Sequence, residues 1–222
     1  MSDYCVKCIY KSLPSITLNL RENETIFIEG DPINYVYIIQ NGLVKVSKIF
    51  PSGEERILDI LGPGDFLALV SVLKGDEEYI AQATTLNKVE LKRLTKADTQ
   101  KAYKANNQFK DMCLSCAMTR TNLFQSQLFN STNYDTEDKI LNVLIYLSKK
   151  FGSIENGRHI INLPFSKTTL ANIIGIRRET LSRKLSKMQD ENVLSIEKNK
   201  YIFDRMWFKS HLFFYLYDIL VT

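Results

Sequence analysis

Histidine is nearly absent from this sequence, and cysteine, proline and glycine are scarce: its 222 residues include 2 His, 4 Cys, 5 Pro and 9 Gly. So few glycines and prolines exclude collagen-like and low-complexity chains, and four cysteines are too few for a disulfide scaffold. His159 and His211 are isolated, there is no glycine-rich phosphate loop, and Ser166 lacks the G-x-S-x-G context of a hydrolase nucleophile. We therefore expect a protein that is not an enzyme.

Long apolar runs are also missing. The longest, at residues 212–221, is about half of a membrane span and contains Asp218. Residues 1–11 are polar and lack the apolar centre of a signal peptide. We expect a cytoplasmic protein with no membrane association.

Neither sign of charge dominates, with 29 basic and 25 acidic residues and a net charge of +4. The segment 160–209 nevertheless holds ten basic and five acidic residues, so the whole positive excess lies there. A cationic segment of this kind predicts a polyanionic partner, usually nucleic acid. The alternative is an ordinary solvated basic surface.

Turn-forming residues divide the region between residues 16 and 94 into short β-prone runs about ten residues apart, which is typical of an antiparallel sandwich or barrel. The turns fall at Gly30-Asp31-Pro32, Asn41-Gly42, Pro51-Ser52-Gly53, Gly62-Pro63-Gly64-Asp65 and Gly75-Asp76. Asn41-Gly42 fits a two-residue hairpin loop, because both positions must tolerate positive φ.

Residues 97–131 contain neither glycine nor proline and predict a long helix. A partial apolar stripe follows helical spacing along it: Phe109, Met112, Cys113, Cys116, Ala117, Phe124 and Leu128. The helix can lie along its own β domain, or it can pair with the same helix of a second subunit. A further helix begins at Asp135, whose carboxylate suits an N-cap.

Residues 165–188 predict two short helices separated by a turn at Gly175. Ser166 is placed to cap the first helix, and Leu181, Leu185 and Met188 form the inward face of the second. Four polar side chains form a separate stripe on that second helix: Arg178, Glu179, Ser182 and Arg183. This pattern predicts a DNA-binding helix-turn-helix whose second helix enters the major groove.

The polar stripe has the chemistry of base reading, because arginine can donate two hydrogen bonds to guanine and glutamate can accept from cytosine. Phosphate contacts are expected from a further set: Ser166, Lys167, Thr168, Arg177, Lys184, Lys187, Lys198 and Lys200. The last two lie at the tip of a hairpin predicted over 193–203, which would make the motif winged.

The order of these parts resembles the Crp/Fnr family of bacterial transcription regulators, over about residues 18–204. The most specific piece is the sequence GIRRETLSR at 175–183, and the β region contributes Gly30-Asp31-Pro32, Asn41-Gly42 and Gly64-Asp65-Phe66. The resemblance implies an α+β protein with an effector-binding antiparallel β-roll at 1–96, a long dimerisation helix at 97–133 and a winged helix-turn-helix at 134–222, ending in an aromatic tail. It also implies a homodimer that binds a palindromic operator in double-stranded DNA, and contact with RNA polymerase.

The resemblance does not extend to the cyclic-nucleotide site. The family's ribose-binding Gly-Glu pair would fall near Ala68-Leu69, and its phosphate-binding Arg element near Glu78-Tyr79. A carboxylate at the phosphate position repels the anion, and no arginine lies between Arg56 and Arg93. We therefore do not expect cyclic AMP as the effector.

The four cysteines form two C-x-x-C pairs, Cys5/Cys8 and Cys113/Cys116. Thiolates so paired suit zinc or an iron–sulfur cluster, or a thiol–disulfide switch. This pattern departs from the iron–sulfur branch of the family, which has a further N-terminal cysteine and one in the β-roll. The alternatives are structural cysteines in a regulator that answers an unidentified small molecule or is constitutively active, and a module whose helix-turn-helix contacts only protein.

Overall fold

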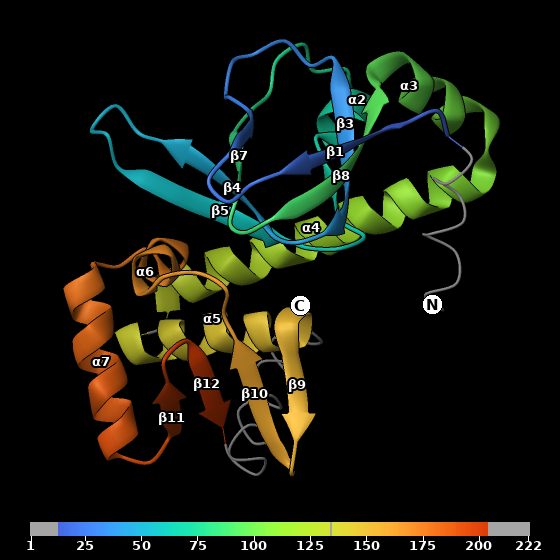
Figure 1. Cartoon of the computed structure of the whole chain (residues 1–222). Coiled ribbons are helices and arrows are strands. Elements are labelled where there is room, and N and C mark those ends of the chain that lie inside the picture. Colours follow the sequence, from blue (N-terminus) through green and yellow to red (C-terminus); the bar gives the residue numbers. More distant parts are fainter. Residues whose placement is uncertain (1–12, 134, 204–222) are drawn as a thin grey trace. The chain divides into compact units, whose positions relative to one another are not determined.

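The computed structural model describes residues 13–133 and 135–203 of the chain. Two compact units make up the chain, Met1–Asn122 and Leu123–Thr222 (Figure 1). Helix α4 (Asn107–Asn133) crosses this boundary. No helix in the described ranges is both long enough and apolar enough to cross a membrane. Cys5, Cys8 and the aromatic tail lie outside the described residues.

The first unit is built on two four-stranded antiparallel sheets (Figure 1). The first sheet has the order β1 (Ile16–Leu20), β8 (Val89–Thr95), β3 (Tyr35–Asn41) and β6 (Phe66–Leu67). The second has the order β2 (Thr25–Phe27), β7 (Gln82–Thr85), β4 (Val44–Ile49) and β5 (Glu55–Leu61). Residues 36–39 of β3 are all buried, and they join the main apolar core of this unit. The predicted antiparallel β domain is confirmed.

The turn at Asn41-Gly42 does not close a hairpin, and that prediction was wrong. Strand β3 pairs with β8 and β6, whereas β4 pairs with β5 and β7, so the chain passes from one sheet to the other at this turn. Gly42 has φ +86°, and a Cβ there would overlap the carbonyl oxygen of Lys88. The glycine therefore allows a close approach between the β3–β4 turn and the β7–β8 connection, in addition to forming the turn.

Helices α2 (Leu69–Lys74) and α3 (Lys96–Ala105) complete the first unit with the start of α4. The expected uninterrupted helix over 97–133 is broken at Asn106, which has φ −126° and ψ 110°. The side-chain oxygen of Asn106 accepts a hydrogen bond from the backbone N–H of Phe109 at 3.0 Å. An asparagine side chain can replace a helical hydrogen bond in this way, so the break needs neither glycine nor proline.

In the described part of the second unit, three helices that follow α4 pack with one sheet. The helices are α5 (Thr136–Phe151), α6 (Lys167–Ile174) and α7 (Arg178–Asp190). The sheet has the order β11 (Leu194–Glu197), β12 (Lys200–Phe203), β10 (Arg158–Asn162) and β9 (Gly152–Glu155), all antiparallel. As expected, Asp135 caps α5 by accepting from the N–H groups of Glu137 and Asp138. The hairpin of β11 and β12 follows α7, as the winged form of the motif requires.

Candidate nucleic-acid interface

A tight turn at Gly175 sets the angle between α6 and α7. Gly175 ends α6 in the left-handed region, with φ 79° and ψ 37°. Its N–H and that of Ile176 both donate to the carbonyl of Ala171, at 2.9 and 3.1 Å. At the other end of α6, Ser166 Oγ accepts from the N–H of Thr169 at 3.1 Å. Both ends of the helix are thus fixed by local hydrogen bonds.

The inward face of α7 orients the helix. Leu181, Leu185 and Met188 are at most 2% exposed, and Leu170 and Ala171 of α6 are equally buried. Since these side chains recur every three or four residues, only one rotation of α7 about its axis buries them all. The core therefore determines which side of α7 faces solvent.

The four side chains predicted to read bases all lie on that solvent side. Arg178, Glu179, Ser182 and Arg183 are exposed. They occupy the first half of α7, the part that contacts base edges in helix-turn-helix proteins. Among the described residues, no ion pair involves Arg178 or Arg183. The stripe is therefore accessible and carries donors and an acceptor suited to the major groove.

The residues expected to contact phosphate fall into two groups. Lys167, Thr168, Arg177 and Lys198 have no ion pair within the described part of the chain, and the last three are exposed. Ser166 is exposed, and its hydroxyl caps α6.

The other three candidates are held by carboxylates. Glu137 accepts from Lys184 Nζ at 2.8 Å and from Lys187 Nζ at 2.9 Å, and Lys200 lies 3.8 Å from Glu155. These hydrogen bonds lower the pKa of Glu137 below its ordinary value, so its carboxylate stays ionised. The sequence shows that Lys184 and Lys187 share one side of α7, but not that Glu137, 47 and 50 positions earlier, reaches both.

Cys113 and Cys116 lie against the β domain. Cys113 belongs to the main core and is 3% exposed, and the half-buried Cys116 packs against it. Burial raises the pKa of Cys113 to about 12 and also raises that of Cys116. Within the described residues, no three His, Cys, Asp or Glu side chains gather as a metal site would require. The same face of α4 places Phe109 and Met112 in the β core, so the first part of the predicted stripe covers its own domain. The side chains of Phe124 and Leu128 lie outside the described residues.

Aromatic side chains fill the interior of the β domain near the expected nucleotide position. Tyr79 is 5% exposed, and its ring stacks on Phe27 with centroids 3.9 Å apart. Its hydroxyl donates to the backbone carbonyl of Tyr35 at 3.1 Å. Leu69 is buried, whereas the carboxylate of Glu78 is exposed. The sequence does not reveal this stack, because Phe27 on β2 and Tyr79 in the segment before β7 are far apart in the chain.

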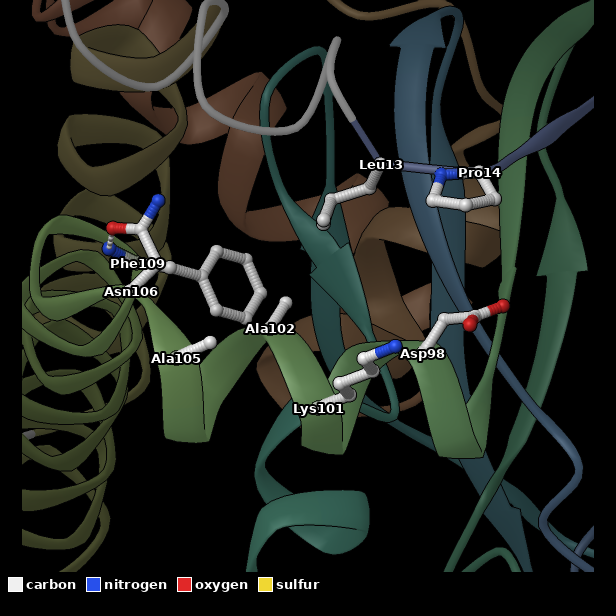
Figure 2. Close-up of a pocket in the computed structure, with 8 residues that line it drawn as sticks. All are labelled: Leu13, Pro14, Asp98, Lys101, Ala102, Ala105, Asn106 and Phe109. Atoms are coloured by element: carbon white, nitrogen blue, oxygen red, sulfur yellow. Dashed lines mark hydrogen bonds between the residues drawn. The ribbon is translucent and has the colours of Figure 1, made fainter.

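A recess of about 300 Å³ lies at the corner between α3 and α4 (Figure 2). Its walls are Leu13, Pro14, Asp98, Lys101, Ala102, Ala105, Asn106 and Phe109. Leu13 and the ring of Phe109 lie on its apolar side, and Asp98 and Lys101 supply its charged groups. None of its lining residues is among the positions at which the Crp/Fnr resemblance places ribose or phosphate.

Comparison with known proteins matches both units to described families. Residues 17–106 match the cyclic nucleotide-binding domain, and residues 138–206 match the Crp-like helix-turn-helix domain. The global nitrogen regulator of Nostoc sp. is 26% identical over 190 residues, which is 85% of each chain. The CRP-like cAMP-activated global transcriptional regulator of Mycobacterium tuberculosis is 25% identical over 174 residues, or 78% of this chain and 77% of the relative.

Solved structures of similar fold are also found. FixK2 from Bradyrhizobium japonicum superposes with a TM-score of 0.78 at 18% identity, over 89% of this chain and 97% of the other. The two matched domains and their order define a transcription regulator with a helix-turn-helix DNA-binding domain. The chain belongs to the Crp/Fnr family.

Proposed function

We propose that the protein binds a palindromic operator as a homodimer and reads each half-site with Arg178, Glu179, Ser182 and Arg183. One observation carries this proposal: these side chains are exposed on α7 while the opposite side of the helix is locked into the core. A helix so oriented can enter the major groove without rearrangement. Lys167, Arg177 and Lys198 would add phosphate contacts.

The dimer is supported by the outer side of α4. Leu114 and Met118, one turn apart, are 60% and 59% exposed in the single chain. Apolar side chains at this spacing on a long helix favour pairing with a second helix. The predicted stripe at Phe109, Met112 and Cys113 is already used by the β core, so the pairing surface lies on the other side of the helix.

Control by cyclic AMP does not form part of this proposal. Tyr79 and Leu69 fill positions where a nucleotide would need a cation and a ribose acceptor. Metal or redox control through all four cysteines would require Cys113 to leave the β core, where its thiol is protonated at neutral pH. The arrangement therefore favours an effector other than cyclic AMP, or no effector.

An operator selected from a random duplex pool tests the proposal directly. Arg178→Ala should weaken binding to the selected operator by about 1–3 kcal/mol and relax the preference at one base pair of each half-site. Binding to a random duplex should change far less. Arg56→Ala, which removes the same charge from an exposed position on β5, is the matched control. If Arg178→Ala lowered the affinity for operator and for random DNA equally, base reading by Arg178 would be contradicted.

A further inference from the structure

Glu137 connects the start of α5 to the recognition helix. One oxygen of its carboxylate, Oε1, accepts from both Lys184 and Lys187. The side chains of Glu137 and Lys184 are 23% and 27% exposed, so water only partly screens their interaction. Lys187 is also 3.6 Å from Glu191, one turn further along α7.

The fold fixes the positions of both partners, Glu137 on α5 and the two lysines on α7. Asp135 caps α5 and thereby sets the backbone position of Glu137 in the first turn. Leu181, Leu185 and Met188 fix the rotation of α7. At about 100° per residue, Lys187 then lies on a flank of α7, about 110° from the centre of the base-reading stripe, and Lys184 lies further round, about 170° from that centre.

Charge is distributed unequally between these two sides of α7. Lys187 on the flank and Lys184 beside it pair with Glu137 and Glu191, so these four charges cancel. The base-reading stripe keeps two arginines against Glu179 and is net positive. The flanks of a helix seated in the major groove are the sides that approach the phosphate backbones. This flank therefore offers phosphates no net positive charge.

We propose that Glu137 is a specificity-determining residue that withholds Lys184 and Lys187 from the DNA backbone. Phosphate contacts contribute affinity without sequence information, so their loss lowers binding to random DNA while base reading continues. The effect does not depend on a strong ion pair. When the ammonium group of a lysine leaves Glu137, the Glu137 carboxylate remains beside the flank and repels the nearest phosphates. The inference rests on the proposed DNA-binding function.

The salt dependence of binding to a random duplex measures the number of phosphates neutralised. Glu137→Gln keeps the shape of the side chain and removes its charge, so the two lysines become available. The slope of log K against log salt should steepen by about one to two units per bound subunit, and affinity at 0.15 M salt should rise about five-fold per freed lysine. Glu54→Gln, an equal charge change in an exposed turn of the first unit, should leave the slope unchanged.

A triple variant separates this effect from altered folding. Adding Lys184→Gln and Lys187→Gln to Glu137→Gln should return the slope to the wild-type value or below, while thermal unfolding shows that each variant is folded. An unchanged slope in Glu137→Gln, or a slope that stays steep without the lysines, overturns the inference. If the wild-type protein shows no preference for a selected operator over random duplex, the proposed function itself fails, which is a different result.

Discussion

At the scale of single residues, the surroundings of a glycine decide what it contributes. Gly42 and Gly53 have nearly the same backbone angle, φ +86° and +83°. A Cβ at Gly53 would meet nothing within 4 Å, whereas one at Gly42 would overlap the carbonyl of Lys88 and lie 2.8 Å from Val89 Cγ2. Sequence alone gives both positions the same role as turn glycines.

This difference predicts unequal costs for the same substitution. Gly53→Ala should lower the free energy of unfolding by about 1–2 kcal/mol, the usual cost of a left-handed alanine. Gly42→Ala should lower it by clearly more, because the backbone of Lys88 must also move. Denaturant unfolding of the two variants measures both values. Equal losses of unfolding free energy would show that the β7–β8 connection does not approach Gly42 closely.

The carboxylate of Glu55 contributes stability that depends on pH. Burial alone raises the pKa of Glu55, but hydrogen bonds from Lys45 and Ser47 outweigh it, and the net shift is downward from 4.5. Because the folded-state pKa is depressed, this contribution is complete above pH 4.5 and is lost as the pH falls through the lower folded-state value.

Glu55→Gln should therefore destabilise the protein most near neutral pH, and its difference from wild type should shrink under acid conditions. Unfolding measured from pH 7 down to pH 3 checks this. Glu54→Gln, at the exposed neighbouring position, should change the unfolding free energy little throughout. A Glu55→Gln difference that stays constant across this range would contradict the assigned hydrogen bonds.

At the scale of elements, α7 has three functional sides rather than the two that its sequence indicates. Apolar spacing predicted the buried side, and residue chemistry predicted the base-reading stripe. On the third side, Glu137 pairs with Lys184 and Lys187. This side can be identified only from the structure, because α5 must pack beside α7 to bring Glu137 there. Local sequence cannot supply a contact between residues about fifty positions apart.

The break between α3 and α4 shows a related limit. The composition of residues 97–131 correctly predicts helix, but Asn106 leaves the helical conformation and its side chain caps α4. An asparagine inside a helical pattern is compatible with continuation or with a cap. Packing of Phe109 into the β core accompanies the cap in this chain.

At the scale of the whole molecule, the proposed dimer depends on the outer side of α4. The double variant Leu114→Glu, Met118→Glu should remain folded, because both side chains are exposed in the single chain. It should be a monomer at concentrations where wild type is a dimer, since four negative charges would meet across the helix pair. Its affinity for a palindromic operator should fall accordingly, because the two half-sites are no longer bound together.

Sedimentation equilibrium measures the change in mass, and circular dichroism verifies the fold. The double variant Gln108→Glu, Thr119→Glu places the same charge at exposed positions of α4 on a different stripe and should remain dimeric. A dimer that survives both double variants would place the subunit interface elsewhere.

The sequence by itself determined the order of elements, the helix-turn-helix and the identity of its exposed polar stripe. These features depend on short-range rules: the spacing of apolar residues, turn glycines and helix caps. Tertiary structure alone decided which sheet each strand joins at Gly42, what fills the β domain around Tyr79, and which cations near α7 are already neutralised. The physical reason is that those outcomes depend on contacts between residues far apart in the chain, which local pattern does not encode.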